Sequence, residues 1–134
     1  MIFLDTSGVY ALADKDDQNH ESALRMFDTV VRSGEEILTH SYVLVESAAL
    51  LQKRLGSEIA LTFLKEADSF TIRWVSPELQ CDAVGYLEER RSSKISLVDA
   101  VSFLVMRRDG ITEYLGFDQH FVDEGFREVK LKRG

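Results

Sequence analysis

The sequence is poor in cysteine, proline and long apolar runs, and these shortages exclude several classes of protein. Cys81 is the only cysteine among 134 residues, which excludes an internal disulfide and a zinc site built from several cysteines. No apolar run approaches the ~20 residues that a transmembrane helix needs. The first five residues contain an acid and no base, unlike a secretory signal peptide, so we expect a cytoplasmic protein without membrane contact.

Basic residues are also in deficit, because 16 Lys and Arg face 23 Asp and Glu and the formal net charge is −7. Phosphate contacts normally come from Lys and Arg, so this deficit argues against a protein that coats DNA by electrostatics alone. Divalent cations held by several of the acids would neutralise part of the charge. The length and the apolar fraction of 45% predict a single globular domain, residues 1–134, able to bury about 70% of its unfolded surface.

Short apolar strands alternate with helical segments along the chain. We expect strands at 2–4, 36–39, 70–75, 113–117 and 128–131, and helices at 8–13, 17–32, 42–55, 57–68, 77–91, 96–108 and 118–124. Asp17 and Ser41 are candidate N-caps, and Pro77, the only proline, suits the first turn of a helix. The alternation predicts an α/β protein, a three-layer α/β/α sandwich with a central parallel sheet, in which ligands bind beyond the carboxyl ends of the strands.

Glu46 is the one charge in residues 42–51, a helical segment that is otherwise apolar nearly all round. Such a helix is buried on most faces, and taking a carboxylate out of water costs several kcal/mol unless a cation compensates. Lys53 and Arg54 lie beyond the reach of an i,i+4 pair. We therefore expect Glu46 to be at least partly buried near a cation. A solvated position, or an ion pair from elsewhere in the fold, is the alternative.

Three aspartates have comparable settings. Asp99 lies in an apolar segment, but Ser96-x-x-Asp99 also has the spacing of a capping box. Asp5 and Asp118 each follow an expected strand and are equally candidates for N-caps of the next helix. Carboxylates gathered at one sheet edge repel one another without cations, and ligand sets made only of oxygen select hard ions. Together with Glu46, these acids predict a site for Mg²⁺ or Mn²⁺.

The order and spacing of the acids resemble the PIN-domain family, most closely its small VapC-type toxins of toxin–antitoxin pairs. The resemblance covers essentially the whole chain and rests on Ile2-Phe3-Leu4-Asp5-Thr6-Ser7, the Glu46 helix, Ser96-Leu97-Val98-Asp99-Ala100 and Phe117-Asp118-Gln119-His120-Phe121. It implies a PIN-like domain that cleaves RNA endonucleolytically with one or two Mg²⁺ or Mn²⁺ ions. It also implies a homodimer and inhibition by a cognate antitoxin.

By position, the resemblance makes Asp5, Glu46, Asp99 and Asp118 the catalytic and metal-site acids. It makes Thr6 or Ser7 the hydroxyl residue beside the first acid. One departure is Gly116, which stands where many relatives have threonine.

Basic residues near helix ends are candidates for holding the phosphates of an RNA. They are Lys53, Arg54, Arg90, Arg91, Lys94, Arg107 and Arg108. Solvated helix ends, which the helix dipole favours, explain any single one of them equally well. His120 is most simply a surface histidine, and Cys81 most simply a buried small residue.

Three alternative functions stay open. A phosphatase or receiver-type domain would use Asp5 as a phosphoryl acceptor, but Ser7 stands where the haloacid-dehalogenase pattern needs a second aspartate. A non-catalytic PIN-like binding module would keep the fold and use its acids only as helix caps. A PIN nuclease outside any toxin–antitoxin pair is the third. Mn²⁺ binding that depends on Asp5 and Asp99 separates an enzyme from a binding module.

Overall fold

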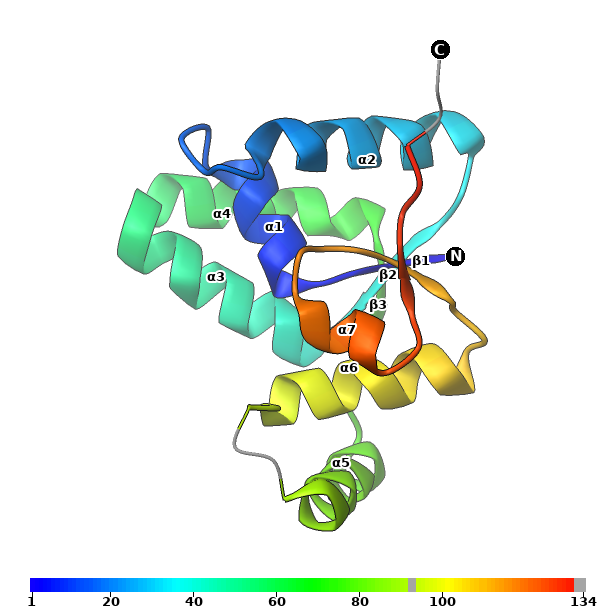
Figure 1. The fold of residues 1–134 in the computed structure, drawn as a ribbon. Helices are drawn as coiled ribbons and strands as arrows, with labels where there is room; N and C mark the ends of the chain where they lie inside the picture. Colours follow the sequence, from blue (N-terminus) through cyan, green and yellow to red (C-terminus); the bar gives the residue numbers. More distant parts are fainter. Residues whose placement is uncertain (92–93, 132–134) are drawn as a thin grey trace.

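The computed structural model describes residues 1–91 and 94–131, and a five-stranded parallel sheet lies at its centre (Figure 1). The strands are β1 (Ile2–Leu4), β2 (Ile37–His40), β3 (Thr71–Arg73), β4 (Glu113–Leu115) and β5 (Arg127–Glu128). Their order is β3-β2-β1-β4-β5, and each neighbouring pair is parallel. The chain winds outward from β1 to β3 and then returns to pair β4 with the other side of β1. A topological switch point, where open parallel sheets bind ligands, therefore lies between β1 and β4.

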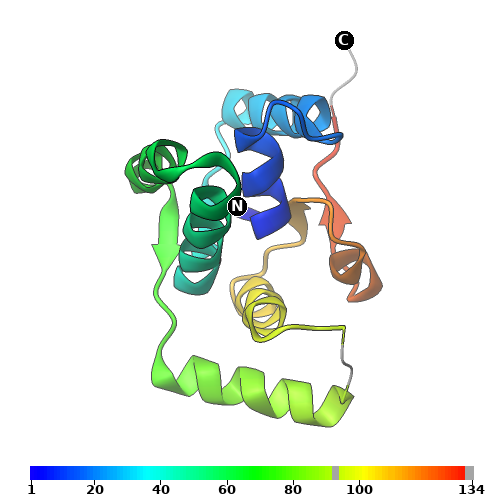
Figure 2. The same ribbon diagram turned by 90° about the vertical axis from the view of Figure 1, so that its left-hand side faces the viewer.

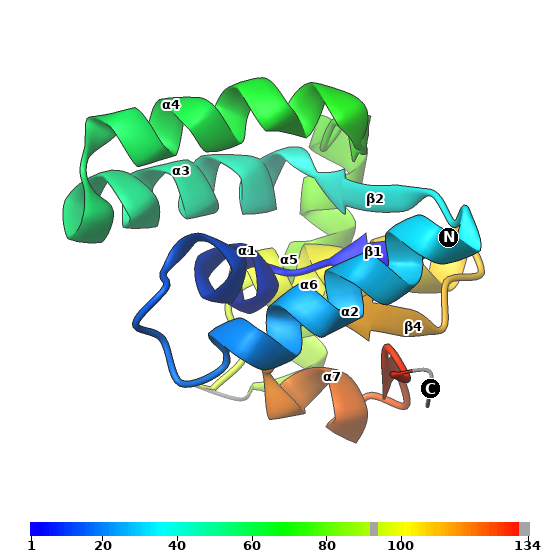
Figure 3. The ribbon, with the colours of Figure 1, turned by 90° about the horizontal axis from the view of Figure 1, so that it is seen from above.

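Helices cover both faces of the sheet, which confirms the predicted three-layer α/β/α sandwich. The α-helices of the described residues are α1 (Thr6–Ala13), α2 (His20–Ser33), α3 (Ser41–Leu55), α4 (Ser57–Glu66), α5 (Pro77–Arg90), α6 (Leu97–Arg108) and α7 (Gln119–Asp123), and a short 3-10 helix, η1 (Ala67–Ser69), follows α4. Figure 2 shows α1 and α2 on one side of the sheet and α5 and α6 on the other. Seen from above in Figure 3, α3 and α4 run side by side, and α1 lies beside α3. Among the described residues, no helix is long and apolar enough to span a bilayer.

Alternating strand residues supply two hydrophobic clusters, one on each face of the sheet. Phe3 and Tyr114 join the cluster beneath α5, α6 and α7, whereas Leu4 and Leu115 join the cluster beneath α1 to α4. This division follows from the two-residue period of a strand, and explains why the strands are apolar on both faces. Phe121 stacks on Tyr114 with ring centroids 4.6 Å apart, so the short α7 is anchored in the core.

The start of α2 differs from the prediction. Asp17 is not its N-cap, because the helix begins only at His20; the Asp17 carboxylate instead accepts a hydrogen bond from the N–H of Asn19 at 2.9 Å in the turn before the helix. Asn19 occupies the N-cap position without a side-chain capping bond, and the helix begins at His20. The residues between α1 and α2 therefore form a short loop.

A buried histidine caps α3, so the prediction of Ser41 as the N-cap is wrong. Nδ1 of His40 accepts the N–H groups of Tyr42 at 3.2 Å and Val43 at 3.3 Å. An accepting Nδ1 puts the proton of the neutral ring on Nε2, which lies 2.8 Å from the hydroxyl of Ser102. Burial lowers the pKa of His40 to about 4, which keeps the ring neutral and able to cap.

Two smaller predictions are also wrong. The fifth strand is residues 127–128 rather than 128–131, because pairing with β4 puts Arg127 opposite Glu113 and Glu128 opposite Tyr114. Cys81 is exposed on α5 rather than buried. The sequence places a cysteine on a helix, but only packing decides which face of the helix meets the sheet.

Candidate active site

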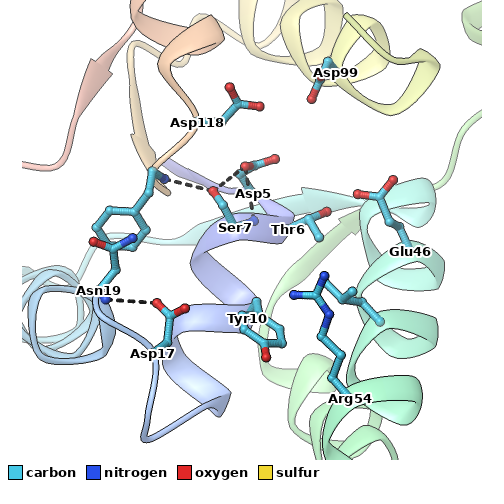
Figure 4. Close-up of a pocket in the computed structure, with 12 residues that line it drawn as sticks. Asp5, Thr6, Ser7, Tyr10, Asp17, Asn19, Glu46, Arg54, Asp99 and Asp118 are labelled. Carbon is cyan, nitrogen blue, oxygen red and sulfur yellow. Dashed lines mark hydrogen bonds between the residues drawn. The ribbon is translucent and has the colours of Figure 1, made fainter. Parts of the chain in front are cut away.

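A cavity of about 350 Å³ opens at the carboxyl ends of β1 and β4 (Figure 4). The four predicted acids, Asp5, Glu46, Asp99 and Asp118, all line this one cavity. They come from the end of β1, from α3, from the first turn of α6 and from the segment between β4 and α7. The fold therefore gathers acids that are scattered along the chain, at the sheet edge where the topology predicts a ligand site.

Asp5 is the most deeply buried of these acids, with 4% of its surface exposed. Its Oδ2 accepts the hydroxyl of Ser7 at 2.7 Å and the N–H of Ser7 at 3.3 Å, so it also caps α1. Burial raises the pKa of Asp5 to about 6, and the negative charges of Asp99 and Asp118 add to this rise, although the bonds from Ser7 oppose it. One carboxylate thus serves the helix and the cavity together.

Asp99 occupies the predicted capping box at the start of α6. Its Oδ2 accepts the N–H of Ser96 at 3.2 Å, and its own N–H donates to the Ser96 hydroxyl at 3.1 Å. Burial raises the pKa of Asp99, and the charge of Asp118 raises it further, whereas the bonds from Ser96 lower it. The capping alternative is therefore correct and does not displace the cavity assignment, because the capped carboxylate still faces the other acids (Figure 4).

Asp118 caps α7 and lies beside His120. Oδ1 of Asp118 accepts a hydrogen bond from the backbone N–H of His120 at 2.9 Å. The ring nitrogen Nδ1 of His120 also lies 2.9 Å from Oδ1. Potential ligand atoms of Asp99, Asp118 and His120 all lie within 4.8 Å of one another. The His120 side chain is 32% exposed, so the expected surface position is partly correct, but the ring also lies against the acids. Its only signal in the sequence is its place two residues after Asp118.

Glu46 is exposed, so the prediction that it is partly buried is wrong. Helices α1 and α4 pack against α3, yet they leave part of it open to solvent, where Val45 is 66% exposed. An apolar sequence on every side of a helix therefore did not mean burial on every side. The Glu46 carboxylate still lines the cavity, across from Asp5 (Figure 4).

Two hydroxyl groups lie beside Asp5, as predicted. Ser7 Oγ donates to Asp5 and accepts the N–H of Phe117 at 2.9 Å, which ties the ends of β1 and β4 together. The Thr6 hydroxyl is buried and has no hydrogen-bond partner among the described residues. A Cβ on Gly116 would lie 2.9 Å from Ser7 Oγ and 3.1 Å from the Cβ of Asp5. Ser7 thus fills the space that a threonine at position 116 would need.

Several of the predicted phosphate-binding bases are engaged elsewhere. Arg90 and Arg107 both pair with Glu124 at 2.6 Å, and Arg108 pairs with Asp82 at 2.7 Å. None of the three lines the cavity. These ion pairs join α5 and α6 to each other and to the end of α7, so a structural role accounts for them.

Of the other predicted bases, three lie outside the cavity and one lines it. Arg91 ends α5 in the left-handed conformation with φ 46°, and neither it nor the exposed Lys94 lines the cavity. Lys53 faces solvent on α3. Arg54, one residue further along, is the one predicted base that lines the cavity.

The donor atoms of the cavity fit a hard divalent cation. Carboxylates of Asp5, Asp99 and Asp118 face one space (Figure 4), and their repulsion contributes to the raised pKa values of the first two. A cation among them removes that repulsion. Carboxylate oxygens are the ligands that Mg²⁺ and Mn²⁺ take, and the imidazole of His120 is compatible with Mn²⁺.

Comparisons with known proteins agree with this geometry. A family model described as PIN domain matches residues 2–127. The chain is 33% identical over 132 residues to the Mycobacterium tuberculosis protein named 23S rRNA-specific endonuclease VapC20, covering 97% of this chain and 98% of that protein. The crystal structure of VapC20, described as a sarcin–ricin loop cleaving toxin, is similar with a TM-score of 0.83 at 30% identity over 94% of this chain and 96% of that one. PAE2754 from Pyrobaculum aerophilum shares the fold, with a TM-score of 0.66 at 20% identity over 96% and 88% of the two chains.

Proposed function

This chain belongs to the PIN-domain family and is an endoribonuclease of the VapC type, and we propose that it cleaves 23S ribosomal RNA as the toxin of a toxin–antitoxin pair. The observation that carries the proposal is the convergence of Asp5, Asp99 and Asp118 on one cavity, in a chain that aligns along almost its whole length with a 23S rRNA endonuclease. We further propose that the ion it needs is Mg²⁺ or Mn²⁺.

In the proposed site Asp99 and Asp118 would hold the ion, with Asp5 beside them and His120 within reach. A bound ion would supply charge neutralisation at the scissile phosphate and a lowered pKa of the attacking water. Ser7 fixes the Asp5 carboxylate by donating its hydroxyl proton to Oδ2. The exposed Glu46 faces the same cavity and accepts a hydrogen bond from water that enters with the substrate. No side chain forms a covalent bond with the RNA in this scheme.

The remaining assignments are proposals of the same kind. The Thr6 hydroxyl, buried without a partner among the described residues, donates to the substrate or to an ordered water. Arg90, Arg91 and Lys94 lie outside the cavity and contact only more distant parts of an RNA. A VapB-type antitoxin is the inhibitory partner, and the enzyme works in the cytoplasm.

A homodimer is a further proposal. Helix α4 presents Leu61, which is 55% exposed, and Leu64, which is 39% exposed, beside Ala48 and Ala49 of α3. Apolar surface of this kind often marks a protein–protein interface. A second copy of the chain is the occupant that the family resemblance implies.

The test is cleavage of total RNA and of a sarcin–ricin loop hairpin by the purified protein. Asp5→Asn and Asp99→Asn should each lower the cleavage rate by at least about 10²-fold, because each removes a negative oxygen from the ion site. Asp68→Asn is the matched control, since Asp68 is exposed and lies outside the cavity, and it should cleave as the wild type does. Undiminished cleavage in excess EDTA would refute metal dependence. Cleavage of total RNA but not of the hairpin would refute only the proposed target.

A further inference from the structure

We propose that Arg54, which lies over the ring of Tyr10 at the end of the cavity away from Asp99 and Asp118 (Figure 4), binds an RNA phosphate next to the scissile one. This subsite rests on the endoribonuclease activity, but not on which RNA is cut. Its ligand is a phosphodiester, the one charged group that every nucleotide of an RNA presents.

Helix geometry places Arg54 beside the acids without mixing it among them. Glu46, Leu50 and Arg54 follow one another at intervals of four residues, so they share one face of α3, and all three line the cavity. Eight residues at 1.5 Å per residue separate Glu46 from Arg54 by about 12 Å along the helix. This separation suits a neighbouring phosphate rather than the scissile one.

The Arg54 guanidinium is held in place before any substrate arrives. Tyr10 donates its hydroxyl proton to Asp14 Oδ2 at 2.7 Å, which fixes the ring. The central guanidinium carbon of Arg54 lies 5.3 Å from the centre of that ring, within the range of a cation–π interaction. Arg54 also donates to the Tyr10 hydroxyl, and the other N–H groups of its guanidinium are available for bonds to phosphate.

Arg54 also brings positive charge to a cavity that is otherwise acidic. Among the described residues that line the cavity, five are acidic and only Arg54 is basic. No carboxylate of the described residues lies within ion-pair distance of Arg54. The charge of Arg54 acts only weakly on Asp14. The pKa of Asp14 is lowered chiefly by the hydrogen bond from Tyr10 and to a lesser degree by Arg54. Arg54 therefore offers the substrate a cation that no ion pair already occupies.

The competing explanation is structural. Arg54 stands in the last turn of α3, where the helix dipole favours a base, and its contact with Tyr10 joins α3 to α1. A purely structural Arg54 would affect unfolding and leave the dependence of cleavage on salt unchanged. A phosphate contact has the opposite signature, because each contact releases counterions when it forms.

The experiment compares Arg54→Gln with Lys53→Gln, which removes the same charge one residue away, outside the cavity. Cleavage of total RNA is measured at several NaCl concentrations. Arg54→Gln should lower kcat/KM about tenfold, mainly through KM, and should flatten the plot of log kcat/KM against log salt by about 0.7. Lys53→Gln should change neither quantity, and Arg54→Lys should restore the slope because it restores the charge.

A modified substrate locates the contact. In an oligonucleotide that the wild type cleaves at one bond, one phosphate at a time next to that bond is replaced by an uncharged methylphosphonate. One replacement should slow the wild type about as much as Arg54→Gln does, and should not slow that variant further. Equal salt slopes for wild type and Arg54→Gln, with a lower unfolding temperature for the variant, would make Arg54 structural and overturn the proposal. Absence of any cleavage by the wild type would instead count against the proposed function.

Discussion

At the residue scale, three of the five acids of the cavity serve two purposes. Asp5 and Asp118 are the N-caps of α1 and α7, and Asp99 is the acid of the α6 capping box. All three also line the cavity. A capping carboxylate accepts hydrogen bonds from the N–H groups at the start of the helix. Its remaining lone pairs are available to another ligand. Capping and ion binding are therefore compatible, and the capping bonds hold the acids in the orientation that a cation needs.

The raised pKa of Asp5 predicts how stability depends on pH in the absence of metal. The pKa is about 6 in the folded chain against an ordinary value of 3.8, so folding favours the protonated carboxyl. The resulting stability is complete below about pH 4 and is lost as the pH rises through 6. Asp5→Asn removes this penalty, and in EDTA at pH 7.5 it should be more stable than the wild type by about 2–3 kcal/mol.

Urea unfolding in EDTA at pH 7.5 and at pH 4.5 measures this effect. The advantage of Asp5→Asn should shrink to about 1 kcal/mol at the lower pH, because the wild-type carboxyl is then mostly protonated in the folded state but still mostly ionised in the unfolded chain. An asparagine can still accept the hydrogen bonds of Ser7, so the cap is retained. An advantage of the same size at both pH values would show that the Asp5 charge is not its origin.

At the scale of elements, close contact between α1 and β4 positions the hydroxyl residues of the site. A Cβ on Gly8 would lie 2.4 Å from the carbonyl oxygen of Leu115, so only glycine lets the helix come this near to the strand. Thr6 and Ser7 belong to the same first turn of α1. Their placement in the cavity therefore depends on that contact.

Gly8→Ala should push α1 away from β4, destabilise the protein by about 1–3 kcal/mol and lower the rate of RNA cleavage. Gly85→Ala is the control, because a Cβ at Gly85 of α5 meets nothing within 4 Å. That substitution should stabilise the protein by up to about 1 kcal/mol, since alanine favours a helix interior. Thermal unfolding and RNA cleavage are measured for both variants. Equal stability and equal cleavage rates of Gly8→Ala and Gly85→Ala would contradict the proposed role of Gly8.

Local patterns predicted most elements, because they depend on neighbours in the chain. The buried first strand, the proline start of α5 and the capping box of α6 all follow from residues within one turn of each other. The N-caps of α2 and α3 could not be predicted from such local patterns. Helix α2 begins at His20, so Asp17 lies in the turn before it, and His40 caps α3 in place of Ser41 because the surrounding core keeps the ring neutral.

At the scale of the whole molecule, an ion in the cavity would join segments from both ends of the chain. Asp5 follows the first strand, whereas Asp99 and Asp118 come from the last third of the sequence. An unfolded chain does not hold these carboxylates together, so an ion binds the folded state almost exclusively. Binding energy then becomes stability of the entire fold.

Mn²⁺ or Mg²⁺ at 100 times its dissociation constant should therefore stabilise the wild type by about 2.7 kcal/mol, a rise in Tm of roughly 10 °C. Asp99→Asn should lose most of this rise, because it removes a negatively charged ligand. Asp68→Asn, with its exposed acid outside the cavity, should keep it. Thermal unfolding with and without the ion is the measurement, and an equal rise in all three proteins would place the ion elsewhere.

The sequence by itself determined the α/β alternation, the parallel sheet and the identity of four of the five acids that line the cavity, because periodicity and residue type are local properties. Only the tertiary structure decided how exposed Glu46 is, that His120 faces Asp99, and which of seven bases reaches the cavity. Those outcomes depend on which face of each helix the sheet covers and on partners such as Glu124, distant along the chain. Packing, which no short stretch of sequence encodes, therefore separated Arg54 from the bases that hold the fold together.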